Sequence, residues 1–258
     1  MQIKVENISY NNLNNITFNI EKGKITGIIS DNINDLNDIN EILYCGKNVK
    51  YIPKYNKKNI ALISIKEVFD TNYGNVYDFL LLKLKEYKIK VDDLDTKIEE
   101  LLKKVDLSKS VLTKDISFLS TSEKIKVLIV SSLLYNPNVL LLDNIFSVLD
   151  SKSRDKIFKL LISLKKFENK TIVISCLDID IMYEFIDDIV ILKNGECLLY
   201  GDKYSCFENE NIIDKPLVVE ISNRVYEKSN IKLGKNDSIN ELIKSIYREV
   251  RWYYALFN

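Results

Sequence analysis

Histidine is absent from this chain of 258 residues, and cysteine is scarce. The four cysteines, Cys45, Cys176, Cys197 and Cys206, show no CxxC spacing. Because histidine and closely spaced cysteines supply most zinc sites, a metal centre of that kind is not expected. We expect the four thiols to be buried and inert.

The chain also lacks a long hydrophobic run and an excess of one charge. Its apolar runs, such as Val127–Val130, fall far short of the roughly 18 residues of a membrane span. Lys plus Arg and Asp plus Glu each number 37, so no global basic surface indicates a nucleic-acid partner. Residues 1–6 resemble neither a signal peptide nor a transit sequence. These absences predict a cytoplasmic globular protein without nucleic-acid binding.

Short apolar runs separated by helical patterns predict an α/β fold with a mostly parallel sheet. Strands that are buried on both faces have this composition, and helices then cover the sheet. Before the first run, Ile16, Phe18 and Ile20 alternate with polar residues, which predicts an antiparallel part. The apolar runs are Ile25–Ile29, Val139–Leu142, Thr171–Ile174 and Ile189–Leu192.

Helical periodicity dominates residues 75–135. Asn136-Pro137 ends this block, because a proline disfavours helical geometry in the residue before it. The predicted helices are Val76–Lys88, Leu94–Val105 and a segment from about Ser122 to Tyr135.

Beyond Gly201 the pattern is helical again. Two helices are predicted over 215–228 and 238–250, the second capped by Asp237 or Ser238. We therefore predict three parts: a core of residues 1–74 and 136–204, a helical subdomain of 75–135, and a C-terminal helical extension of 205–258.

The segment from Leu119 to Asp150 resembles two motifs of the ATP-binding cassette (ABC) ATPases. Leu119-Ser120-Thr121-Ser122-Glu123 stands where the family has Leu-Ser-Gly-Gly-Gln, and Val139–Asp143 resembles the Walker B strand. The Leu149-Asp150 pair and the hairpin-like Ile189–Gly201 are also similar to family elements. The tail resembles the extension through which energy-coupling factor (ECF) ATPase subunits pair, although a generic helical tail would read similarly. The resemblance implies a P-loop NTPase-like ABC ATPase fold with an antiparallel β part and an inserted helical subdomain.

The phosphate loop of the family would fall on residues 30–38, after the first buried strand. Of the family pattern only Asn32 is present; Ser30 begins the loop, Leu36 replaces the lysine, Asn37 replaces the magnesium-binding hydroxyl, and no glycine remains. We expect Asp35 to cap the following helix, with Asp38 at the third helical position, so that the helix uses its own donors. The loop therefore predicts poor phosphate binding.

The signature turn is similarly altered. Ser120 and Glu123 have the spacing of a capping box, while Thr121 and Ser122 replace the glycines. Glu123 would place a negative charge where the γ-phosphate approaches in the family. We predict a capped helix. A partial contribution of this turn to the nucleotide site of a partner subunit remains an open alternative.

The remaining catalytic positions are substituted as well. Asp143 could still hold Mg²⁺ through water, but Asn144 replaces the glutamate that polarises the attacking water, and an amide cannot accept a proton. Leu177 falls on the switch histidine and Ile65 near the linking-loop glutamine. Tyr10 could stack on adenine or pack within its own strand.

The resemblance implies an ABC subunit of a membrane importer, ECF-like and serving vitamin or metal-ion uptake. The missing residues favour a degenerate subunit, the structural or regulatory half of a heterodimer, with binding of ATP and Mg²⁺ weak or absent. Its partners would be an intact second ATPase subunit, contacted through Ser147, Leu149 and Asp150, and a transmembrane coupling subunit at the inner face of the membrane. The alternatives are an active ATPase with divergent motifs and a soluble scaffold outside transport.

Overall fold

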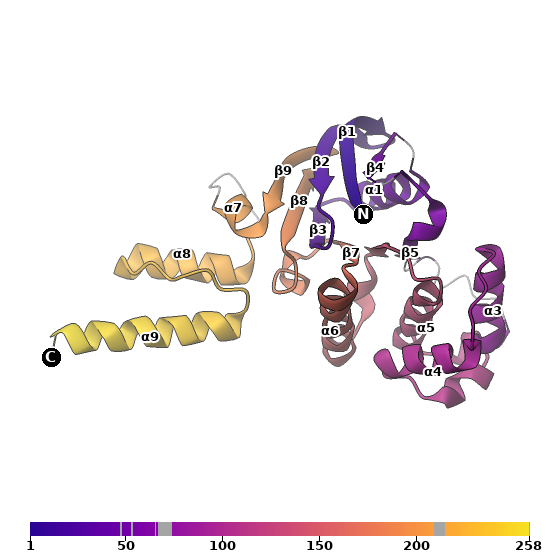
Figure 1. The fold of residues 1–258 in the computed structure, drawn as a ribbon. Helices are drawn as coiled ribbons and strands as arrows, with labels where there is room; N and C mark the ends of the chain where they lie inside the picture. The colour runs from indigo at the N-terminus through magenta and orange to yellow at the C-terminus, as the bar shows by residue number, and fades with distance from the viewer. Residues whose placement is uncertain (47, 53, 65, 67–73, 209–214, 258) are drawn as a thin grey trace.

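The computed structural model describes residues 1–46, 48–52, 54–64, 66, 74–208 and 215–257, with side chains to residue 249. A six-stranded sheet of order β5-β6-β7-β3-β8-β9 forms its centre (Figure 1). All neighbouring pairs are parallel except β8 and β9, so the predicted mostly parallel sheet is confirmed. The strands are β3 (Ile25–Ser30), β5 (Ile60–Ser64), β6 (Val139–Asp143), β7 (Thr171–Cys176), β8 (Asp188–Lys193) and β9 (Glu196–Asp202).

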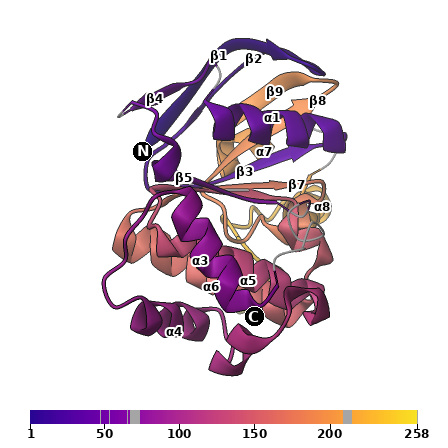
Figure 2. The same ribbon diagram turned by 90° about the vertical axis from the view of Figure 1, so that its right-hand side faces the viewer.

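A three-stranded antiparallel sheet of order β2-β1-β4 faces one side of the central sheet. It consists of β1 (Gln2–Tyr10), β2 (Leu13–Ile20) and β4 (Lys50–Ile52). Helix α1 (Ile33–Cys45) lies between the two sheets (Figure 2) and packs apolar residues against both. The alternation of Ile16, Phe18 and Ile20 turns these side chains toward α1, since every second residue of a strand faces the same side.

The opposite face of the central sheet carries the helical part of the chain (Figure 2). The first three of its helices end within a few residues of their predicted limits, α5 stops just before Asn136-Pro137, and no limits were predicted for the fourth. They are α3 (Val76–Glu86), α4 (Leu94–Lys104), α5 (Thr121–Leu134) and α6 (Ser151–Glu168). Short 3-10 turns are η1 (Lys57–Asn59), η2 (Lys109–Thr113), η3 (Ile116–Phe118), η4 (Ile145–Val148) and η5 (Ile179–Ile181).

After β9 the chain forms α7 (Lys203–Phe207), and then α8 (Leu217–Ser229) and α9 (Ile239–Phe257) project from the body (Figure 1). Ser238 caps α9, because its hydroxyl accepts from the backbone N–H of Glu241 at 3.3 Å. Helix α9 continues beyond the predicted end at residue 250. The Nζ of Lys203 is buried and lies 2.8 Å from the Asp237 carboxylate, which ties the extension to the body.

The four cysteines differ in burial. Cys45 is exposed, so the prediction of buried thiols is wrong there; the last residue of α1 lies outside the face of the helix that packs between the sheets. Cys176 and Cys206 are buried, and Cys197 is half-buried. Within the described ranges, no helix combines the length and apolarity that a bilayer crossing requires.

Candidate functional site

The junction between β3 and α1 is short. Strand β3 ends at Ser30 and α1 begins at Ile33, so only Asp31 and Asn32 connect them. The cap is Asn32, whose Oδ1 accepts from the backbone N–H of Asn34 at 3.0 Å. The prediction that Asp35 caps the helix with Asp38 at its third position is therefore wrong. The helix begins earlier than expected, and Asp35 itself occupies the third helical position.

The Asp35 carboxylate is fully buried in the first turn of α1. It accepts hydrogen bonds from the Ser30 hydroxyl at 3.1 Å, the Asn32 side-chain amide at 3.3 Å and the backbone N–H of Gly195 at 3.2 Å. The backbone dipoles at a helix start favour a negative charge in this place. Gly195 lies in the β8–β9 turn at φ 77°, where an added Cβ would approach the carbonyl oxygen of Asn12 to 2.0 Å. The carboxylate thus joins α1 to a distant hairpin.

The next residues of α1 face in three directions. Leu36 is fully buried in the core between α1 and the three-stranded sheet, and Asn37 is half-buried. The Asp38 carboxylate accepts from the side chain of Asn11 at 3.0 Å and the backbone N–H of Asn12 at 3.2 Å. Leu36, the residue predicted to stand at the position of the family lysine, is therefore part of the hydrophobic core.

Asp143 ends β6 inside a buried polar network. The parallel register places it between Ser64 of β5 and Ser175 of β7. One carboxylate oxygen accepts from the Ser64 hydroxyl at 2.7 Å, and the other accepts from the Asn40 amide at 2.8 Å and the Ser175 hydroxyl at 3.4 Å. Asn40 was not among the predicted site residues; a polar residue beside Ile39 on the buried face of α1 was the signal that could have identified it.

Of the other predicted catalytic positions, Asn144 and Leu177 lie within the described residues. Asn144 has a left-handed backbone at φ 50°, its N–H donates to the carbonyl of Ser175 at 3.0 Å, and its side-chain oxygen is buried without a partner among the described residues. Leu177 follows β7 with 46% of its surface exposed. Ile65 lies outside the described residues.

The ring of Tyr10 packs partly against the core around α1. Its hydroxyl donates to the Glu41 carboxylate at 2.8 Å, and this hydrogen bond raises the pKa of Tyr10. The tyrosine thus has a packing role within the chain, and adenine stacking stays a prediction.

The start of α5 is the predicted capping box. The backbone N–H of Ser120 donates to Glu123 at 2.9 Å, and the N–H of Glu123 donates to the Ser120 hydroxyl at 3.2 Å. These hydrogen bonds from Ser120 hold the pKa of Glu123 below its usual value. The Ser122 hydroxyl bonds that of Ser153 in α6 at 2.9 Å.

The predicted interface residues lie just before α6. Ser147 and Asp150 are exposed, but Leu149 is only 4% exposed and packs in the core. Asp150 caps α6 by accepting from the N–H of Ser153 at 2.9 Å. Of the three predicted interface residues, Ser147 and Asp150 therefore have exposed side chains and Leu149 does not.

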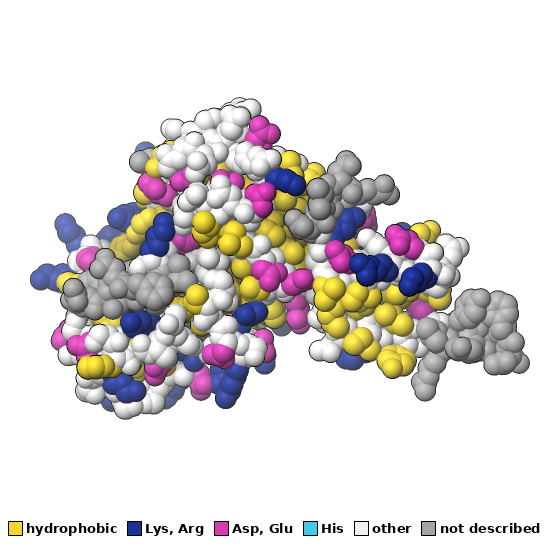
Figure 3. All heavy atoms as spheres, turned by 180° about the vertical axis from the view of Figure 1, so that it is seen from behind, with side chains coloured by type: hydrophobic (Ala, Val, Ile, Leu, Met, Phe, Trp, Pro, Cys, Tyr) yellow, Lys and Arg dark blue, Asp and Glu magenta, His cyan; other side chains and the backbone are white. Residues whose placement is uncertain are grey.

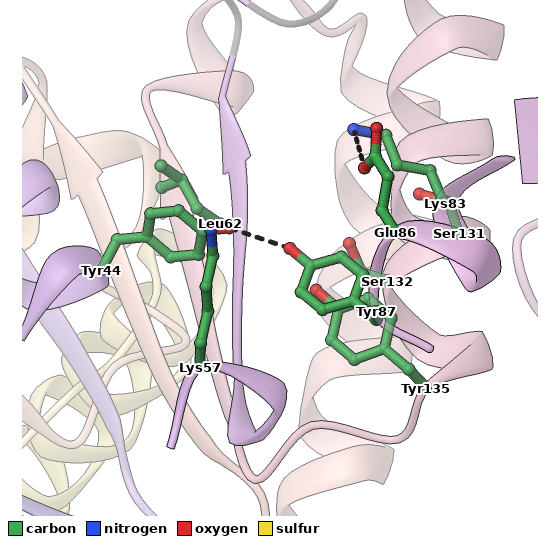
Figure 4. A pocket seen from close by; sticks show the side chains of 9 residues that line it. All are labelled: Tyr44, Lys57, Leu62, Lys83, Glu86, Tyr87, Ser131, Ser132 and Tyr135. Atoms are coloured by element: carbon green, nitrogen blue, oxygen red, sulfur yellow. Dashed lines mark hydrogen bonds and ion pairs between the residues drawn. The ribbon is translucent and has the colours of Figure 1, made fainter. Parts of the chain in front are cut away.

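A cavity of about 480 Å³ lies between the central sheet and the helical part (Figure 4). Tyr44 at the end of α1 and Tyr87 after α3 face each other there, with 2.8 Å between their hydroxyl oxygens. The ring of Tyr87 stacks on that of Tyr135 with centroids 4.3 Å apart, and the Nζ of Lys57 lies 5.4 Å from the centre of the Tyr44 ring. Burial raises the pKa of Tyr135, so its hydroxyl stays neutral. These tyrosines join α1 to the helical part.

The fold defined by these elements is that of the ABC ATPases. Among solved structures, cbiO1 of Clostridium perfringens, part of the ABC transporter complex cbiONQ, superposes with a TM-score of 0.68 and 22% identity over 88% of this chain and 95% of its own. A dimeric bacterial ABC transporter cassette gives a TM-score of 0.65 at 21% identity over 78% of this chain and 98% of its own. The predicted fold class is therefore confirmed.

In sequence, the chain is distantly related to ATP-binding subunits of ABC transporters. The energy-coupling factor transporter ATP-binding protein EcfA of Malacoplasma penetrans is 24% identical over 93% of both chains. A methionine import ATP-binding protein of Clostridium acetobutylicum is 26% identical over 95% of this chain and 82% of its own. No family model matches the sequence.

Proposed function

We propose that this chain is an ATP-binding-cassette subunit of an ECF-type membrane importer for a vitamin or a metal ion, and that it serves as the structural or regulatory half of a dimer without hydrolysing ATP. The similarity to EcfA over nearly the full length supports the importer class. The observation that carries the loss of hydrolysis is the buried Asp35 carboxylate at the start of α1.

The Asp35 carboxylate opposes phosphate binding in two ways. It uses the hydroxyl of Ser30 and the N–H of Gly195, two donors that face the start of α1. Its charge would also oppose a phosphate charge about 8 Å away by roughly 2 kcal/mol at an effective dielectric near 20. Leu36 lies in the core and offers no compensating cation. The residues present therefore do not fit the phosphates of ATP.

The residues at the end of β6, Asp143 and Asn144, support the same proposal. Both oxygens of Asp143 already accept hydrogen bonds within the network around Asn40, which leaves this carboxylate poorly placed to orient a metal-bound water. Asn144 cannot accept a proton, and the loss of a general base typically lowers a rate by about 10² to 10⁴. We propose that nucleotide and Mg²⁺ bind weakly or not at all.

The proposed partner is a second, intact ATPase subunit. In head-to-tail ABC dimers each site combines the phosphate loop of one subunit with the signature turn of the other. Here Glu123 is locked into the capping box of α5, so the turn offers a carboxylate instead of glycine amides. A heterodimer would therefore have one site lacking a phosphate loop and one lacking a normal signature turn.

Exposed apolar side chains on the C-terminal extension support a second contact with the partner subunit. Hydrophobic side chains gather on it in Figure 3, and Ile239, Ile243 and Tyr247, at helical spacing on α9, are 38%, 45% and 70% exposed. We propose residues 205–258 as the pairing extension, 75–135 as the signature subdomain, and 1–74 with 136–204 as the ATPase core. The transmembrane coupling subunit would hold the assembly at the inner face of the membrane.

A Mg-ATP titration by calorimetry, on the chain alone and with its co-purified partner, tests the proposal. We expect no heat of binding for the chain alone and no turnover. Tight binding by the isolated chain would contradict the degenerate role, and turnover lost in Asp143→Ala would establish an active ATPase. Failure to recover any integral membrane partner would favour the soluble scaffold.

A further inference from the structure

A polar cavity of about 610 Å³ lies beside α1 at the carboxyl ends of β5 and β6. Asp38 and Glu41 of α1 and Asp143 of β6 line it, together with several asparagines. Lys66 is the one cation among its described lining residues, and its side chain is exposed. Three carboxylates against one lysine make the described part of the cavity wall negative.

The three carboxylates accept hydrogen bonds, and no described cation forms an ion pair with them. Asp38 accepts from Asn11 and the backbone of Asn12, Glu41 accepts from the hydroxyl of Tyr10, and Asp143 accepts from neutral donors only. In the described part of the chain, none of the three forms an ion pair. A cavity walled by one sign of charge concentrates ligands of the opposite sign.

An unpartnered amide points independently to a ligand with N–H donors. Asn40 lines the cavity and is only 1% exposed. Its nitrogen donates to Asp143 and Ser175, while its Oδ1 has no partner among the described residues. Buried side-chain oxygens nearly always have a donor, so a ligand that supplied an N–H here would satisfy an oxygen that the described residues leave unpaired.

We propose that this cavity binds an organic cation with spaced N–H groups, of the diamine or polyamine class, in place of a nucleotide. Its volume is that of ordinary small-molecule sites, which span about 300–1,000 Å³. In the described ranges no three acidic, histidine or cysteine side chains lie close enough together to hold a metal ion. An extended amine, by contrast, reaches separate carboxylates. The inference rests on the proposed function in one respect, the absence of phosphate binding at α1.

Calorimetric titration with spermidine tests the site, using the full chain at low and at moderate salt. Spermidine is expected to bind one to one and more weakly as salt rises, whereas ATP is expected to give no signal. Glu41→Gln keeps an acceptor for Tyr10 and is expected to weaken spermidine binding about fivefold, the value of a favourable exposed ion pair. Asn37→Lys, at a half-buried lining position, is expected to abolish binding.

The matched control is Glu6→Gln, which removes the same charge from an exposed position of β1 away from the cavity lining. Equal weakening by Glu41→Gln and Glu6→Gln would overturn the inference, because the attraction would then be nonspecific. If neither spermidine nor ATP bound, the cation site would be overturned while the proposed function stood. Tight ATP binding would overturn the proposed function itself.

Discussion

Replacing Asp35 by alanine is the sharpest test of the start of α1. The change removes a fully buried carboxylate and leaves the hydroxyl of Ser30 and the N–H of Gly195 as buried donors. A buried donor without a partner costs about 1–3 kcal/mol. Relief from burying a charge returns part of this cost. We expect Asp35→Ala to lower the free energy of unfolding by about 2–3 kcal/mol.

Urea unfolding followed by circular dichroism measures the effect as a shift of the midpoint at constant slope. The matched control is Asp31→Ala, at an exposed neighbouring position for which no described residue forms a hydrogen bond to the side chain. Exposed substitutions of this kind usually change stability by less than about 0.5 kcal/mol. Asp35→Asn, which retains one acceptor oxygen, is expected to fall between the two.

Adding inorganic phosphate to the urea unfolding experiment tests whether Asp35 substitutes for a bound anion. If the carboxylate occupies an anion-binding place at the helix start, inorganic phosphate should raise the midpoint of Asp35→Ala more than that of the wild type. Equal stability of Asp35→Ala and Asp31→Ala would refute the account of the Asp35 contacts. A larger phosphate effect on the wild type would refute its role as a substitute anion.

Three further predictions concern the helical part and the extension. Glu123→Ala should lower stability by about 0.5–1.5 kcal/mol at neutral pH, because it removes the carboxylate that accepts from the N–H of Ser120. Because the pKa of Glu123 is lowered in the folded state, this contribution is present above the unfolded pKa and is lost as pH falls through the folded pKa. Tyr87→Phe should cost about 1 kcal/mol by removing the hydroxyl contact with Tyr44, measured by urea unfolding. Asp237→Asn should leave Lys203 buried without its counter-charge and raise hydrogen exchange in α8 and α9 while the central sheet stays protected.

Each of these predictions has a control and a contrary outcome. For Glu123→Ala, a difference from wild type that persists unchanged at pH 3 would contradict the assigned ionisation. For Tyr87→Phe, the control is Tyr247→Phe at an exposed position of α9, and equal losses would contradict a specific contact. For Asp237→Asn, uniform exchange in the extension and the sheet would contradict local release.

Local patterns in the sequence were sufficient to predict much of the secondary structure. The apolar run Ile25–Ile29 predicted a buried strand because β-branched residues pack well in a parallel sheet, and β3 occupies that place. The spacing of Ser120 and Glu123 predicted the capping box because both partners lie within one helical turn. Each signal needs only a few consecutive residues.

The candidate site was harder to predict because its contacts join distant residues. The cap of α1 was misassigned to Asp35, since Asp and Asn are nearly equal caps and spacing alone cannot choose between them. Asn40 was missed because its partner Asp143 lies 103 residues away. The exposure of Cys45 depends on which side of α1 faces the two sheets, and the residue type alone does not report that.

The sequence by itself therefore determined the α/β class and the resemblance to ABC ATPases, and it predicted that Leu36 stands in place of the phosphate-loop lysine, because these follow from residue type and order. Only the tertiary structure decided which residues contact one another at the start of α1. It brought the N–H of Gly195 to Asp35 across 160 residues and placed Leu36 in the core. It also gathered Asp38, Glu41 and Asp143 around one cavity. Such contacts depend on how α1 packs between two sheets, and that packing is a property of the whole chain.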